Sequence, residues 1–279
     1  VSGLKRILFT AVGVAGLLIL SAVALALFAD INAYRPRLEK AASDALGMEV
    51  RVGGRLGIAL FPGVHVKLDD VHIRNREIEI ASAKEANLEI AFLPLLHREV
   101  RVTEISLKRP RISLKRGRDG RFNFERREEV RGTPFALALD HLSLSDGAFL
   151  YEDEQSGGEF KAENFTLDVR SLRVAGGNSA ELLKNLSFTA EFAGREIRTK
   201  EIAFSDVKFT GKGKDGIIAL KPVTMRLFGG QGSGSIGADF SGRVPHYTVR
   251  STLAKFRIEE YFKTFSAKRV AEGAMDFSA

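Results

Sequence analysis

The residue types that perform chemistry are present in this chain, but their spacing matches no catalytic signature. None of the five histidines has the i, i+4 partner of a zinc-binding helix, and no cluster of carboxylates accompanies them. They are His65, His72, His97, His141 and His246. The chain has no cysteine, so thiol chemistry and disulfides are excluded. The pairs Asp69-Asp70 and Glu128-Glu129 would point to opposite faces of a strand. We therefore expect no catalytic residue, no metal site and no cofactor, and we expect that the protein is not an enzyme.

Two glycine-rich segments, residues 211–216 and 232–237, satisfy the G-x-G-x-x-G spacing of dinucleotide-binding loops. That fingerprint requires a strand before it and a helix after it, because the pyrophosphate sits at the N-terminus of the helix. Strand-like residues follow both segments. We interpret both as hairpin turns, with the second turn covering Gly229 to Gly237, and we expect no nucleotide binding.

An uncharged apolar run extends from Ile7 to Phe28, directly after Lys5 and Arg6. A helix rises about 1.5 Å per residue, so this run can cross a hydrocarbon core of roughly 30 Å. We predict that residues 1–29 form a cytoplasmic stub and a transmembrane helix, because cations on a short stub stay in the cytoplasm. The alternative is a cleaved signal peptide, for which Ser21-Ala22-Val23-Ala24 offers a weak cleavage site.

The formal net charge of +7 suits an anionic partner such as phospholipid headgroups, although the basic residues are scattered along the chain. The densest basic run is Lys108-Arg109-Pro110-Arg111. Such a run can meet headgroups or phosphates, but charges and proline also protect a solvated strand edge from aggregation. Because we predict export of the chain, we expect no nucleic-acid partner.

Beyond the apolar run, the residue pattern changes from helical to strand-like. Residues 30–47 predict a short amphipathic helix, with apolar residues at helical spacing and Gly47 as its C-cap. From Met48 onward polar and apolar residues alternate with period two, and a phase shift at Asp69-Asp70 suggests a bulge. Helical spacing returns only near Ile258 to Phe265. The pattern predicts a mainly β domain over residues 48–279, built on a long antiparallel sheet with few short helices.

A long sheet with one apolar face must cover that face, and few helices are available to do so. Three covers are possible: a second sheet in a sandwich, closure into a barrel, or an open trough whose lining contacts lipid tails. Periodicity alone does not separate these three alternatives.

The succession of several segments behind an N-terminal anchor resembles the bacterial AsmA family. These segments are Leu56 to Val64, Leu68 to Asn75, Leu88 to Leu96, Val102 to Pro110, Asp119 to Phe124, Leu227 to Gly234 and Ile258 to Gly273. Phe124 stands where the family more often has tryptophan. The resemblance covers nearly the whole chain.

The resemblance implies a curled, taco-like or chorein-like β-groove in a protein of outer-membrane biogenesis, which moves or binds phospholipid. It also implies a single-pass protein of the bacterial inner membrane with most of its chain in the periplasm. The expected partners are phospholipid or another acyl lipid, the inner membrane and envelope proteins. Because a strand pattern begins at Ala274, just before the chain stops, we expect the groove domain to be truncated at its C-terminus. The alternative function is a scaffold or regulator of envelope protein assembly that has a dry β-sandwich core and carries no lipid.

Twelve apolar residues are the candidates for lining such a groove, since each occupies the apolar phase of its predicted strand. They are Val66, Leu68, Ile90, Phe92, Val102, Leu107, Leu137, Leu139, Leu167, Val169, Phe188 and Phe204. The assignment depends on register, because a slip of one residue moves every later side chain to the other face.

Overall fold

The computed structural model describes residues 35–59, 63–97, 99, 101–125, 135–176, 179–242, 244–264 and 272–279. The predicted transmembrane helix at Ile7 to Phe28 lies outside these ranges. No helix within them is both long enough and apolar enough to cross a membrane.

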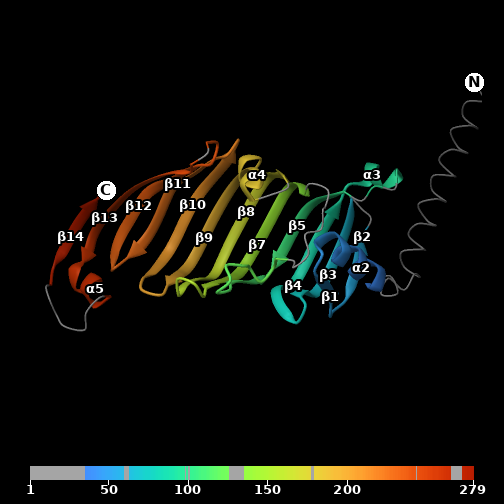
Figure 1. Ribbon diagram of the computed structural model, residues 1–279, viewed down its shortest axis with the longest axis horizontal. Helices are drawn as coiled ribbons and strands as arrows, with labels where there is room; N and C mark the ends of the chain where they lie inside the picture. Colours follow the sequence, from blue (N-terminus) through green and yellow to red (C-terminus); the bar gives the residue numbers. More distant parts are fainter. Residues whose placement is uncertain are drawn as a thin grey trace, which may run out of the picture.

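Within these ranges fourteen strands form one long mixed sheet, so the prediction of a mainly β protein is confirmed. The strands are β1 (Glu49–Val52), β2 (Leu56–Ala59), β3 (Val64–Asn75), β4 (Ile78–Ile90), β5 (Val102–Lys108), β6 (Arg111–Arg116), β7 (Phe135–Asp153), β8 (Gly158–Gly176), β9 (Ser187–Thr199), β10 (Ala203–Lys214), β11 (Ile217–Leu227), β12 (Gly230–Asp239), β13 (His246–Arg257) and β14 (Ala274–Ser278). Figure 1 shows them side by side, with β1 to β4 at one end and β14 at the other.

In the part of the chain that the structure describes, four short helices accompany the sheet: α2 (Arg35–Leu46), α3 (Phe92–Leu96), α4 (Ser179–Lys184) and α5 (Ile258–Lys263). Figure 1 places them at the ends and margins of the sheet. The helix predicted before the first strand is observed as α2. It ends at Gly47, which has the left-handed φ of 64° and donates its N–H to the Ser43 carbonyl at 2.7 Å.

The prediction of a wholly antiparallel sheet is wrong, because β7 pairs in parallel with β5 and with β6. Strands β5 and β6 follow one line that is interrupted at Arg109-Pro110, and the Pro110 carbonyl still accepts the N–H of Ala148 at 2.8 Å. Residues 117–134 connect β6 to β7. Parallel neighbours need a crossover of about a dozen residues or more, and this connection is long enough to return the chain to its starting edge.

The described strands leave the sheet open. All fourteen belong to a single sheet, and the strand order begins at β1 and ends at β14 without pairing these two strands. Within these residues no second sheet packs on the first. Of the three covers that the sequence left open, the described strands therefore form neither a sandwich nor a barrel.

The pairing register separates the two faces of the sheet, because directly paired residues point to the same side. One row runs across β7 to β10 as Leu144, Leu167, Phe192 and Phe209. We call the side with this row the apolar face. The adjacent row on the opposite side, which we call the polar face, carries Ser143, Asp168, Glu191 and Thr210.

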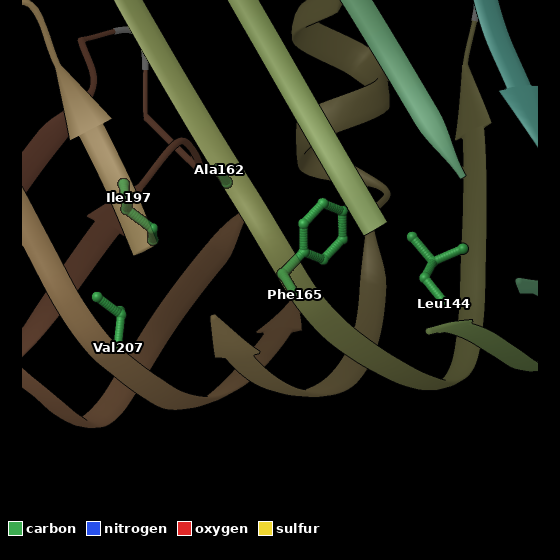
Figure 2. Close-up of a cluster of buried hydrophobic side chains, with 5 residues drawn as sticks. All are labelled: Leu144, Ala162, Phe165, Ile197 and Val207. Atoms are coloured by element: carbon green, nitrogen blue, oxygen red, sulfur yellow. The ribbon is translucent and has the colours of Figure 1, made fainter. Parts of the chain in front are cut away.

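A cluster of buried apolar residues occupies the middle of the apolar face. Figure 2 shows its five members on β7 to β10: Leu144, Ala162, Phe165, Ile197 and Val207. Three residues with left-handed φ lie beside it, Asp146 on β7 (53°), Asn164 on β8 (51°) and Asp206 on β10 (51°). Such irregular positions bend a strand and increase its twist. The buried cluster therefore sits where β7, β8 and β10 each have an irregular backbone position.

The phase shift predicted at Asp69-Asp70 is confirmed and coincides with a left-handed φ of 59° at Asp70, but the predicted bulge is not present in the β3–β4 pairing, whose register continues from Asp69 and Glu85 to Val71 and Ala83. The apolar phase of β3 changes there from even to odd residue numbers, from Leu68 to Val71, and both face alanines of β4. Asp tolerates this backbone conformation better than most residues, because its short side chain bonds locally.

The prediction of a turn over Gly229 to Gly237 is wrong, because Gly230–Asp239 is strand β12. The turn lies at Phe228-Gly229, which have φ values of 51° and 75°. Glycines in this strand serve packing: a Cβ on Gly232 would lie 2.9 Å from Cγ of Met225, so the missing side chain leaves room for Met225. The first glycine segment does contain a hairpin turn, at Asp215-Gly216.

Candidate functional site

Register and burial bring eleven of the twelve candidate lining residues together on the apolar face. They are Val66, Leu68, Ile90, Val102, Leu107, Leu137, Leu139, Leu167, Val169, Phe188 and Phe204. One row of the register shows the continuity: Val66, Leu88, Ile105, Leu142 and Val169 face one another across β3, β4, β5, β7 and β8. That these residues line a lipid path stays a prediction.

Phe92, the twelfth candidate, does not lie on the sheet. Strand β4 ends at Ile90, and Phe92 begins α3, where its side chain is 58% exposed. The strand pattern continued through Phe92 in the sequence, but Pro94 lies two residues further on. Proline has no N–H for strand pairing and is tolerated in the first turn of a helix.

Exposure on the apolar face rises toward the β14 end. The buried cluster lies on β7 to β10, whereas Val249 on β13 is 63% exposed and Phe277 on β14 is 53% exposed. Part of the reason is the sequence of β12, which contributes glycines to this face and so gives its neighbours little to pack against. Contiguous exposed apolar side chains mark places where a ligand or a partner binds.

The polar face is crossed by ion pairs between neighbouring strands. Glu85 on β4 lies between Lys67 on β3, at 2.8 Å, and Lys108 on β5, at 2.9 Å. Hydrogen bonds from these two lysines, Lys67 first, lower the pKa of Glu85 from an ordinary 4.5 to about 2. Glu85 therefore stays charged at every physiological pH and links three strands through solvent-facing groups.

A second ion-pair group on this face was not visible in the sequence, because its members are far apart along the chain. His141 Nε2 lies 2.5 Å from Oδ2 of Asp168, and Nδ1 lies 3.6 Å from Oε2 of Glu104. The hydrogen bond from His141 holds the pKa of the Asp168 carboxyl below its ordinary value. The group joins β5, β7 and β8 at the place where β5 and β7 pair in parallel.

At the β1 end, side chains of α2 accept hydrogen bonds from backbone N–H groups at the edge of the sheet. Val50 donates its N–H to Oγ of Ser43 at 2.8 Å, and Val52 donates to Oε1 of Glu39 at 2.7 Å. Residues four apart on a helix share one side, so a single side of α2 covers the edge of β1. Free strand edges invite pairing with other chains, and α2 prevents this here.

These features define a β-sheet protein with a long apolar face on one side and a charged, solvated face on the other. The AsmA family model matches residues 5–213, well over half of the 279 residues, and the chain belongs to the AsmA family. The resemblance found in the sequence is thereby confirmed. Comparisons with curated proteins and with solved structures gave no match.

Proposed function

We propose that this protein acts in outer-membrane biogenesis and binds phospholipid or another acyl lipid on its apolar face, along which acyl chains move. The observation that carries the proposal is the continuous apolar face of a single open sheet, whose β14 end leaves large apolar side chains exposed. Membership of the AsmA family supports a role at the cell envelope.

The physical argument is the transfer of hydrocarbon out of water. An acyl chain that lies on the apolar face removes its own surface and that of the sheet from water, which stabilises the complex by about 25 cal/mol per Å² of apolar area. A headgroup can remain in water at the margin of the sheet. Such binding requires a continuous apolar surface and no catalytic step, so the proposal includes no enzyme activity, metal or cofactor.

The proposed location is the bacterial inner membrane, with one span and most of the chain in the periplasm. Support comes from the apolar run Ile7 to Phe28 behind Lys5 and Arg6, and from the family. The inner membrane and envelope proteins are the proposed partners besides lipid.

A scaffold for envelope protein assembly is the second candidate, because exposed apolar side chains such as Val249 and Phe277 would also suit a protein partner. The sequence predicts a dry sandwich core for this candidate. Since the described strands form one sheet, the scaffold would have to use the apolar face itself as a protein-binding surface.

Lipid analysis of detergent-free protein separates the two candidates. Residues 35–279 should be used, because α2 covers the edge of β1 and should not be removed. We expect phospholipid to co-purify and to be identified by mass spectrometry after organic extraction. Folded protein that carries no lipid, and takes up none when mixed with phospholipid vesicles, would instead support the scaffold.

A further inference from the structure

A cavity of about 480 Å³ lies between α5 and the apolar face at the β14 end of the sheet. We call it the α5 cavity. The side chains that define it are almost all apolar and come from β11, β13, α5 and β14: Leu227, Leu253, Tyr261, Phe262, Met275 and Phe277. Its volume falls within the roughly 300–1,000 Å³ of ordinary small-molecule sites.

The cavity exists because a glycine strand and a loosely held helix face each other. Gly232 of β12 lies between Met225 of β11 and Leu253 of β13, so the floor is formed by the side chains of these two neighbours, and β12 adds none of its own there. Above it, none of the residues of α5 is buried. Tyr261 packs edge-on against Phe228 with ring centroids 5.5 Å apart, which holds the helix over the face without filling the space beneath it.

A second cavity of about 560 Å³ adjoins the first and is charged. The two share Leu227 and Phe228 as a common wall. The charged residues of the second cavity are Arg226, Arg257, Lys263, Glu201 and Glu260. Three cations and two carboxylates line this space, and a third carboxylate, Asp206, pairs with Arg226 from outside the lining.

Glu260 is shared by two of these cations, since it lies 2.8 Å from Nζ of Lys263 and 3.6 Å from Arg257. Arg226 pairs with Asp206 at 3.5 Å, and both side chains are largely exposed. The cations can therefore turn toward an anion at little cost, because exposed pairs of this kind are weak.

We propose that the α5 cavity holds one acyl chain of an anionic amphiphile whose headgroup lies in the adjoining charged cavity. The inference rests on the proposed function, since it assumes that acyl chains bind the apolar face. It goes beyond that function by assigning one discrete site, whose acyl-chain part, α5 with β11 to β14, lies outside residues 5–213 that the family model matches.

The test uses a tryptophan reporter, because the chain has no tryptophan of its own. Tyr261→Trp places the reporter in the α5 cavity. Tyr247→Trp is the matched reporter, on the apolar face of β13 but outside the cavity. The full chain is reconstituted in vesicles of unbrominated phosphatidylcholine, and lysophosphatidylglycerol with a dibrominated acyl chain is added as the quencher.

We expect quenching of the Tyr261→Trp protein to saturate at one ligand per chain, while the Tyr247→Trp protein is quenched only weakly. Met275→Glu in the first background should abolish saturable quenching, and Thr248→Glu, on the polar face, should leave it intact. Equal quenching of the two reporters would overturn the discrete site but not the proposed function. Quenching of neither, in folded protein, would overturn both.

The headgroup is tested with a dibrominated monoacylglycerol of the same chain length, which has no charge. We expect it to bind about tenfold more weakly than the anionic ligand, since hydrogen bonds to a charged group are lost. The difference should shrink in the double variant Arg226→Gln with Lys263→Gln. Equal affinity of the two ligands in the unmodified cavity would overturn the assignment of an anionic headgroup.

Discussion

The ring of Phe165 lies over the backbone of Gly147, its direct partner in the register of β7 and β8. A Cβ on Gly147 would be 2.6 Å from Cζ of the ring, closer than two carbon atoms can approach. The same arrangement recurs where Phe188 lies over Gly213, its partner across β9 and β10. Glycine partners let aromatic rings lie flat on the sheet, so the apolar face is lined by ring faces.

We predict that Gly147→Ala destabilises the protein by about 1–3 kcal/mol, because Phe165 is buried and has no room to move away. The measurement is the free energy of unfolding in urea. Gly57→Ala on β2 is the control, since its new Cβ would meet only Cβ of Lys67 at 3.7 Å. Equal stability of the two variants would show that the ring can shift at no cost.

We predict that Leu167→Asp or Ile236→Asp removes most of the lipid that co-purifies with residues 35–279. Both side chains lie on the apolar face and neither is fully buried, so a carboxylate there should meet the acyl chain in a folded protein. Thr166→Asp, one position along β8 and exposed on the polar face, is the control.

Circular dichroism and the melting temperature show whether each variant is folded, which is needed to interpret a loss of lipid. Loss of lipid with the fold retained supports the binding face. If Leu167→Asp unfolds the domain while Ile236→Asp folds and keeps its lipid, the middle of the face is closed core and the proposed path is wrong.

We predict that Glu85→Gln destabilises the protein at neutral pH and that the effect fades in acid. The pKa of Glu85 is lowered from 4.5 to about 2 by Lys67 and Lys108, so the folded state binds this proton less readily than the unfolded state. The stabilisation is therefore fully present above about pH 4.5 and is lost as the pH falls toward 2. The check is urea unfolding of both proteins at several pH values across this range.

A control background makes the pH test specific to the lysine pairs. With Lys67→Met and Lys108→Met the shift in the pKa of Glu85 should largely disappear, and with it the dependence of the Glu85→Gln effect on pH. If the stability difference between the unmodified protein and the Glu85→Gln variant stays constant from neutral pH down to about pH 2, the assignment is contradicted.

We predict that Ser43→Ala and Glu39→Ala loosen the β1 edge of the sheet. Each removes the acceptor of a strand N–H, of Val50 and of Val52 respectively, and a lost hydrogen bond of this kind costs about 1 kcal/mol. Hydrogen exchange of these two amides should accelerate. Asp44→Ala, an exposed residue of the same helix, should leave both exchange rates unchanged.

Much of the fold could be predicted because the sequence marks its irregularities as well as its strands. Alternation placed eleven of the twelve candidates on one face, even though the apolar phase changes several times along the sheet. Several of the changes coincide with Asp or Asn residues, such as Asp70, Asn164 and Asp206, that adopt left-handed φ without ending a strand, and Ser171 and Lys255 have the same conformation. Each of these residues shifts the alternation of apolar and polar positions only locally. Assigning the apolar residues separately within each strand segment therefore still places them on the apolar face.

The errors share a physical cause, which is that pairing and packing are long-range. The parallel pairing of β5 and β7 depends on how the connection between β6 and β7 runs, and the local pattern does not encode this path. The glycines of β12 predicted a turn, because their packing role depends on side chains of neighbouring strands, such as Met225, that the local sequence does not identify. The α5 cavity, likewise, needs residues from several elements that are far apart along the chain.

The principal contacts of each strand are with its immediate neighbours in the sheet. The number of strands, and with it the length of the sheet, can therefore differ between related proteins without a rearrangement of the remaining strands. Among the described residues the buried cluster joins only β7 to β10, so outside these strands a hairpin could be inserted or deleted at the cost of only two local interfaces, as in repeat proteins. The length of the apolar face can then change in steps of one hairpin. Local opening should follow the same logic, with the strands at the two ends exchanging their amide hydrogens sooner than the buried cluster on β7 to β10.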